Sequence, residues 1–143
     1  MKTCEEVMTP NPVCCLPTDS VKRAAEYMKR ENVGPIPVIE NEQTRKLIGI
    51  ITDRDLVLKV IAKGHDTLST RVESVMTRKM VSCRADDSLQ KAMDLMSKHQ
   101  LRRITIVDKA HVILGIISQA DLATRGNKPE KTAEVVKDIS QST

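Results

Sequence analysis

Two segments of the sequence end in a hydroxyl group that is followed, three residues later, by a carboxylate. The heptapeptide GIITDRD at 49–55 recurs as GIISQAD at 115–121, so Thr52 pairs with Asp55 and Ser118 pairs with Asp121. In each copy a glycine and two isoleucines precede the hydroxyl, which is typical of a buried strand that leads into a helix. The four polar residues are therefore expected at two strand-to-helix turns.

Two kinds of chemistry fit this spacing. Thr52 or Ser118 could cap its helix while the aspartate reaches back to the backbone, which is a variant of the capping box. Alternatively, the free N–H groups of the helix start bind a phosphate, and the nearby carboxylate binds ribose hydroxyls, as in dinucleotide folds. One copy alone favours capping, whereas the repetition of the pattern supports ligand binding, because both copies would lie at corresponding edges of a pseudo-symmetric cleft.

The repeat extends beyond these turns. Val-Met-Thr at 7–9 recurs at 75–77, and Cys15 and Cys83 occupy equivalent positions. Two units of this size are each too small to bury a full core, so they are expected to pack against each other. A pair of this kind forms two related clefts, where small ligands commonly bind.

Each repeat is predicted to form a strand, a helix, a hairpin of two strands and a second helix. The helices carry apolar residues at helical spacing, and the hairpin strands contain runs of isoleucine and valine. This order gives a mixed α/β (α+β) class. We expect repeat 1 at residues 1–66, repeat 2 at 67–126, and a tail at 127–143 that could form a short helix and is either a packing arm for a partner subunit or a frayed end. The predicted strands are 13–16, 36–39, 47–51, 81–83, 104–107 and 112–117, and the second helices are 53–63 and 119–125.

Composition limits the function classes. The 143 residues include no Trp or Phe and one Tyr, and their net charge of +4 is not gathered in a basic run, so nucleic-acid binding is not expected. The chain has no apolar run of membrane-spanning length and no charged-then-apolar leader, which predicts a protein that stays in the cytoplasm.

Metal and catalytic sites are not expected either. The cysteines at 4, 14, 15 and 83 lack zinc-site spacing and are interpreted as buried structural thiols. No two histidines share ligand spacing, and the sequence contains no nucleophile next to a base and no P-loop. We therefore predict no metal, no obligatory cofactor and no enzyme activity.

From about 7 to 125, the sequence resembles a stand-alone pair of CBS domains, also called a Bateman module. The repeated ending Gly-h-h-Thr/Ser-x-x-Asp carries this resemblance. It implies two pseudo-symmetric β-α-β-β-α repeats packed sheet to sheet, with clefts that bind AMP, ADP or ATP, or alternatively NAD or S-adenosylmethionine. It also implies that Asp55 and Asp121 bind ribose, with Thr52 and Ser118 near ribose or phosphate.

The resemblance implies further ligand contacts. The adenine would be held by main-chain groups near the first strand and by apolar residues, which correspond here to Pro12, Val13, Ile36, Met80, Val81 and Ile104. Basic residues before the second strand commonly reach the phosphates. The second repeat has Arg102 and Arg103 there, whereas the first repeat has Gly34 and Pro35, with Arg54 as a further phosphate candidate.

Two functions remain open at this stage. The leading hypothesis is a regulatory module that binds an adenine nucleotide and signals to an unknown protein by a conformational change. The alternative is a scaffold or dimerisation module without a ligand. In both cases a homodimer through the helices is expected, with Met28 and Met96 at matching positions on apolar helix faces.

Overall fold

The computed structural model describes residues 2–125, which form two compact units. The first-repeat unit comprises Pro12–Met80, and the second-repeat unit comprises residues 2–11 together with residues 81–125. The units therefore differ from the sequence repeats at 1–66 and 67–126, because residues 2–11 pack with the second repeat and residues 67–80 pack with the first. The expected tail helix at 127–143 lies outside the described residues.

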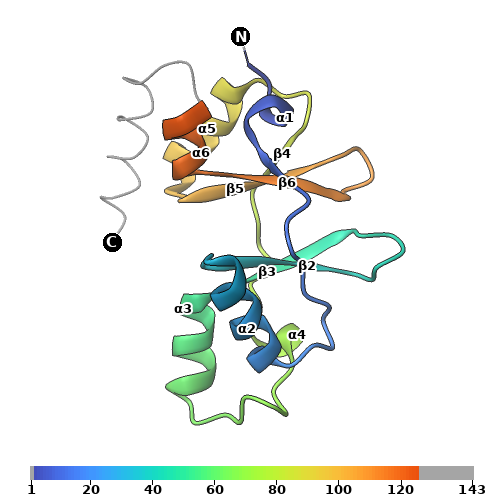
Figure 1. The fold of residues 1–143 in the computed structure, drawn as a ribbon, viewed down its shortest axis with the longest axis vertical. Helices are drawn as coiled ribbons and strands as arrows, with labels where there is room; N and C mark the ends of the chain where they lie inside the picture. The colour runs from blue at the N-terminus through green and yellow to red at the C-terminus, as the bar shows by residue number, and fades with distance from the viewer. Residues whose placement is uncertain (1, 126–143) are drawn as a thin grey trace. The chain divides into compact units, whose positions relative to one another are not determined.

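The first-repeat unit contains a two-stranded hairpin covered by helices on one face (Figure 1). Strands β2 (Pro35–Ile39) and β3 (Leu47–Thr52) pair antiparallel. Helix α2 (Val21–Glu31) precedes the hairpin, and α3 (Asp53–Leu56) follows it directly. A π-helical turn, η1 (Val57–Ile61), extends α3, and the short helix α4 (Val72–Val75) completes the unit.

The second-repeat unit contains a four-stranded sheet in the order β1-β6-β5-β4. Its strands are β1 (Thr9–Pro10), β4 (Ser82–Arg84), β5 (Arg103–Val107) and β6 (Ile113–Ser118). Its helices are α1 (Cys4–Val7), α5 (Leu89–His99) and α6 (Gln119–Arg125), and they lie on one face of the sheet (Figure 1). The N-terminal strand β1 pairs with β6 although almost the whole described chain separates them.

The two long helices form where the repeated pattern predicts them. Ser20 and Ser88 cap the starts of α2 and α5, and each hydroxyl oxygen accepts a hydrogen bond from the backbone N–H three residues on. Asn32 and Gln100 end the helices in the left-handed conformation, with φ of 54° and 55°. The apolar stripe is buried as expected, except that Ala25 is exposed.

Each unit has its own core of buried apolar side chains. In the first-repeat unit the largest fully buried residues are Ile36, Ile51, Val21, Val38 and Val60. In the second-repeat unit they are Val7, Met96, Ile104, Ile106, Ile117 and Leu122. Val7 belongs to the core of the second repeat and Val75 to that of the first. The two Val-Met-Thr segments thus pack into the opposite repeat.

The predicted α+β class is confirmed, and two local expectations need correction. The segment 13–16 forms no extended strand, and only an isolated parallel bridge joins Cys15 to Val38. The helix expected over 53–63 changes at Val57 from α- to π-helix and ends at Ile61. The short helices α1 and α4, which hold the Val-Met-Thr segments against the opposite repeat, were not predicted.

Candidate functional site

The turn between β3 and α3 has the geometry of a capping box. The backbone N–H of Thr52 donates to Oδ2 of Asp55 at 3.0 Å, and the N–H of Asp55 donates back to the Thr52 hydroxyl at 3.1 Å. Two backbone donors at the helix start are therefore satisfied by side chains. Asp55 is only 7% exposed, so its carboxylate needs these partners.

Two further residues contact the Asp55 carboxylate. The Thr77 hydroxyl, next to α4, lies 3.3 Å from both carboxylate oxygens. The ammonium of Lys59 forms an ion pair with Oδ1 at 2.9 Å and also donates to the main-chain oxygen of Val75 at 3.0 Å. Lys59 therefore ties the carboxylate to the end of α4. A negative charge can be buried here because a cation and hydrogen-bond donors surround it.

The turn between β6 and α6 repeats this arrangement in the second-repeat unit. Oδ2 of Asp121 accepts hydrogen bonds from the Ser118 backbone N–H at 3.0 Å and from the Ser118 hydroxyl at 3.2 Å. The Thr9 hydroxyl donates to Oδ1 of Asp121 at 2.9 Å. Asp121 is also 7% exposed. Each unit thus holds its own buried aspartate between the hydroxyl residue of the turn and the threonine of a Val-Met-Thr segment.

The repeated glycines explain how the Val-Met-Thr segments approach so closely. A Cβ on Gly115 would lie 2.8 Å from the main-chain oxygen of Thr9, and a Cβ on Gly49 would lie 3.1 Å from that of Thr77. The same Cβ atoms would meet the sulfur atoms of Met8 and Met76 at 2.5 and 2.7 Å. A larger residue on either strand would push this segment away from the aspartate.

Capping is therefore present at both turns, as the first interpretation of the sequence expected. It does not use the whole carboxylate, because Oδ1 of each aspartate is held by side chains rather than by the turn backbone. Side-chain partners can be exchanged for ligand hydroxyls without unwinding the helix. Ribose binding by Asp55 and Asp121, with Thr52 and Ser118, stays a prediction.

The three arginines predicted to bind phosphate lie at different distances along the chain and sheet from the two aspartates, and only one of them begins a strand. Arg103 begins β5 and is the ladder partner of Ser118, so it lies at the same end of the sheet as Asp121. Arg102 is exposed, and its main-chain oxygen accepts a hydrogen bond from the N–H of Gln119 at 3.3 Å. Arg54 is exposed in α3, next to Asp55 in sequence. In the first repeat Pro35, which carries no charge, is the ladder partner of Thr52.

The residues predicted to bind adenine fall into two groups. Ile36 and Ile104 are each 1% exposed and belong to the cores of their units, so their side chains serve packing. Pro12, Val13, Met80 and Val81 are half-buried and keep accessible surface. Of the six, these four are the positions that a ligand could reach in the structure as it stands.

The four cysteines are free thiols in the structure. Cys4, Cys15 and Cys83 are buried, whereas Cys14 is half-buried, which departs from the expectation that all four are buried. The hydrogen bond between the thiols of Cys4 and Cys83, together with burial, raises the pKa of Cys4, and the same hydrogen bond lowers the pKa of Cys83. Among residues 2–125 no group of acidic, cysteine or histidine side chains is arranged to hold a metal ion.

The basis of the predicted dimer needs correction. Met28 and Met96 are 8% and 0% exposed and pack inside their own units, so they are not available to a partner. The exposed apolar residues instead include Val57, Leu58 and Ile61, which follow one another along η1. We call these three residues the η1 patch.

Sequence reasoning missed the threonines and Lys59. The repetition of Val-Met-Thr was visible, but nothing in one repeat indicates that Thr9 contacts Asp121 and Thr77 contacts Asp55. Lys59 stands four residues after Asp55, a spacing that favours an ion pair on a helix. This spacing could have predicted the contact between Lys59 and Asp55 from the sequence.

Comparisons with known proteins agree with this architecture. The family model described as "CBS domain" matches residues 4–62 and 72–127. The CBS domain-containing protein YhcV of Bacillus subtilis is 36% identical over 140 residues, which cover 98% of this chain and 96% of the relative. No helix within the described residues is both long and apolar enough to cross a membrane.

Solved structures show the same fold. Hypoxic Response Protein I, crystallised with two coordinated zinc ions, superposes with a TM-score of 0.76 at 28% identity, covering 87% of this chain and 98% of that one. The CBS domain pair of protein MJ0100, solved with 5′-methylthioadenosine and S-adenosyl-L-methionine, gives a TM-score of 0.74 at 24% identity, covering 86% and 94%. With both repeats matched by the family model, the chain belongs to the CBS domain family.

Proposed function

We propose that this chain is a non-catalytic regulatory module that binds an adenosyl ligand, AMP, ADP or ATP, through Asp55 and Asp121. One observation carries the proposal. At corresponding turns of both units, a hydroxyl side chain precedes a buried aspartate, and one oxygen of that aspartate contacts only side chains that a ligand could displace. Capping alone requires only the other oxygen. Ribose hydroxyls could take the place of the threonine hydroxyl, because both are donors to the same carboxylate oxygen.

The phosphate side of the ligand fits the second-repeat unit better. Arg103 faces Ser118 across the β5–β6 ladder. Ser118 precedes Asp121 by three residues in the sequence. A guanidinium in this place can form a two-point contact with phosphate oxygens. In the first-repeat unit the corresponding ladder position is Pro35, and the basic candidates are Arg54 and Lys59. We therefore expect the two sites to differ in affinity for phosphate-bearing ligands.

The fold itself accommodates adenosyl compounds in another protein, the MJ0100 pair, which was solved with two of them. NAD and S-adenosylmethionine therefore remain alternatives. Ligand binding would regulate a partner protein only if one arrangement of the module bound the ligand more tightly than another. We propose that this role is cytoplasmic, a compartment in which the four thiols would stay reduced.

A scaffold role is the second candidate, and the η1 patch favours it. Ile61 is 68% exposed and Val57 is 50% exposed, and a row of exposed apolar side chains on one helix is typical of a surface that binds another protein. A homodimer through η1 is compatible with either function. In a pure scaffold, however, adenosyl compounds would not bind.

The test is to titrate the protein with AMP, ADP, ATP, NAD and S-adenosylmethionine, and to measure binding by calorimetry and by the shift in thermal unfolding. A ligand at about 100 times its Kd adds roughly 2.7 kcal/mol to the stability. Asp55→Asn and Asp121→Asn keep an oxygen that can cap the helix but remove the charge, so each should weaken binding about tenfold. Asp86→Asn, at an exposed position in the second-repeat unit, is the matched control. If no ligand shifts the melting temperature, the scaffold role is favoured.

A further inference from the structure

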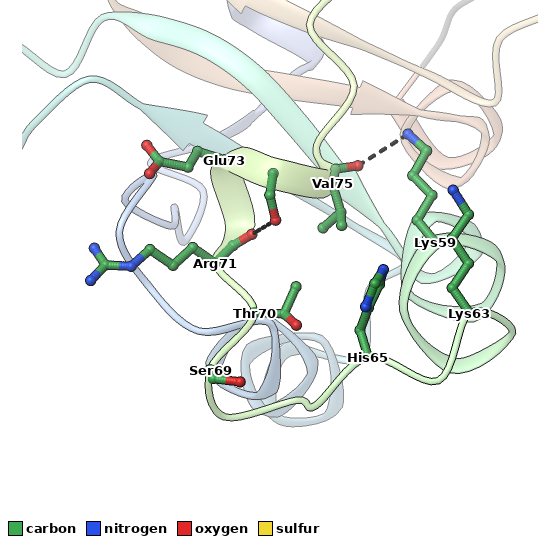
Figure 2. Close-up of a pocket in the computed structure, with 9 residues that line it drawn as sticks. Lys59, Lys63, His65, Ser69, Thr70, Arg71, Glu73 and Val75 are labelled. Atoms are coloured by element: carbon green, nitrogen blue, oxygen red, sulfur yellow. Dashed lines mark hydrogen bonds between the residues drawn. The ribbon is translucent and has the colours of Figure 1, made fainter.

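The first-repeat unit contains a second polar site, a pocket of about 490 Å³. It lies between η1, the loop that follows it, and α4 (Figure 2). Lys59 and Lys63 line one wall, His65 comes from the loop, and Thr70 and Val75 belong to the opposite side. Neither the family match nor the turn motifs point to this pocket, and it was not predicted from the sequence.

Several donors in the pocket have no side-chain partner among the residues that the structure describes. Within residues 2–125 the side chains of Lys63, His65 and Thr70 make no hydrogen bond or ion pair. The Lys59 ammonium, in contrast, is engaged by Asp55 and by the main chain of Val75. Figure 2 shows the side chains of Lys59 and Lys63 extending in the same direction from the helical segment, with the His65 ring beside them. Unengaged donors around one hollow form a binding surface for an acceptor-rich ligand.

The charge around this hollow is positive. Arg71 and Glu73 also line the pocket, but Figure 2 shows both side chains extending away from the lysines. The carboxylate of Glu73 therefore does not neutralise the lysine wall. The Lys63 ammonium, with the His65 imidazole and the Lys59 ammonium of the Asp55 ion pair beside it and the Thr70 hydroxyl across the hollow, can contact several oxygens of a phosphate group, which lysine contacts as a point charge.

The walls also exclude some ligands. Among the described residues that line the pocket, Val75 is the one aliphatic side chain, and none is Phe, Tyr or Trp. Pockets for bases and other flat rings are lined mainly by apolar and aromatic side chains. The volume is larger than a single phosphate needs. We infer that this pocket binds a small, hydrophilic polyanion that carries phosphate groups, with Lys63, His65 and Thr70 as its contacts and Lys59 as a further cation.

The test uses inorganic pyrophosphate as the probe and the full chain as the protein. Calorimetric titration at about 0.01 M salt should show saturable binding that weakens at about 0.3 M salt, because exposed charges are then screened. Amide NMR shifts should change in the segment 63–71. Lys63→Gln should weaken binding about tenfold, since it removes a charged hydrogen-bond donor.

Lys29→Gln is the matched control, because Lys29 is exposed on α2 of the same unit and does not line the pocket. It should leave the pyrophosphate affinity unchanged, and both variants should unfold like the parent. Equal weakening by both variants, no binding at low salt, or shifts confined to other segments would overturn the proposal. Adenosine, which lacks phosphate, separates this site from the proposed adenosyl site: Lys63→Gln should not alter its affinity. If adenosine fails to bind while pyrophosphate binds normally, only the adenosyl site is refuted.

Discussion

The Thr9 hydroxyl donates a hydrogen bond of 2.9 Å to Oδ1 of Asp121, so the first repeated motif of the chain contacts the last one. Thr77 stands in the same relation to Asp55, with distances of 3.3 Å to both carboxylate oxygens. Each threonine opens one repeat and contacts the aspartate of the other. The two repeats are therefore joined by an exchange of their leading segments, and each exchanged segment ends at a buried carboxylate.

This exchange predicts unequal effects of removing the two hydroxyls. Thr9→Val keeps the side-chain shape but leaves Oδ1 of Asp121 without its short hydrogen bond, which should cost about 1.5 kcal/mol of unfolding free energy. Thr77→Val removes only long contacts and should cost less. Urea unfolding measures both effects, with the exposed Thr67→Val as the control. A larger loss for Thr77→Val than for Thr9→Val would contradict this assignment.

The glycines on β3 and β6 should not tolerate a side chain. Gly115→Ala places a Cβ 2.8 Å from the main-chain oxygen of Thr9, so the segment must shift, and we expect about 1–3 kcal/mol of destabilisation. At Gly34 a Cβ would meet the Asp53 side chain at 3.3 Å, and this side chain can move. Gly34→Ala should therefore be tolerated better in the same thermal or urea unfolding experiment. Equal stability of the two variants would argue against a close approach at Gly115.

Arg103 should distinguish charged from uncharged ligands. If it contacts phosphate beside Ser118, Arg102→Gln together with Arg103→Gln should lower the affinity for AMP about tenfold while leaving adenosine binding nearly unchanged. Arg54→Gln serves as the comparison in the first-repeat unit and should have a smaller effect. Calorimetry at two salt concentrations gives both affinities. Equal losses for AMP and adenosine would mean that these arginines shape the site and do not bind phosphate.

The buried thiol of Cys15 should make the protein less stable in alkaline solution. Burial, with smaller contributions from Asp19 and Cys14, raises the pKa of Cys15 to about 12 from 9.0. Above the lower value the unfolded chain loses this proton while the folded chain keeps it, so raising the pH favours unfolding by about 1.4 kcal/mol per pH unit until the pH reaches the folded pKa. Below the lower value the thiol contributes no pH dependence.

Urea unfolding from about pH 8 to about pH 10 measures this slope. Cys15→Ala should lower the overall stability and also flatten the slope. Val38→Ala truncates a residue of the same core and should lower the stability without changing the slope. Parallel pH curves for the parent and Cys15→Ala would show that this thiol does not titrate with the raised pKa.

The η1 patch should mediate self-association. Ile61→Lys adds a charge at a position that is 68% exposed, so it should convert a dimer to a monomer with little change in folding stability. Leu68 is equally exposed at 68% but lies outside η1, and Leu68→Lys should leave the dimer intact. Light scattering at tens of micromolar distinguishes the two states. A parent protein that is monomeric under these conditions would refute the predicted homodimer.

The sequence by itself determined the elements that depend on neighbouring residues. The capped helices α2 and α5, the hairpins β2–β3 and β5–β6 and the two turns with Thr52 and Ser118 all follow from spacing over a few residues. The family could be identified for the same reason, because the repeated turn motif is local. Local hydrogen bonding and periodic burial act between residues close in sequence, so a single pass along the chain can detect them.

Only the tertiary structure decided which copy of a motif contacts which. The pairing of Thr9 with Asp121 depends on residues brought together from distant parts of the chain, and the pocket beside Lys63 depends on how η1, its following loop and α4 pack. Two repeats that carry the same short motifs offer the same local signals for an exchanged and an unexchanged arrangement. The choice is made by which core buries Val7 and Val75, and that is a property of the packed units and not of either segment alone.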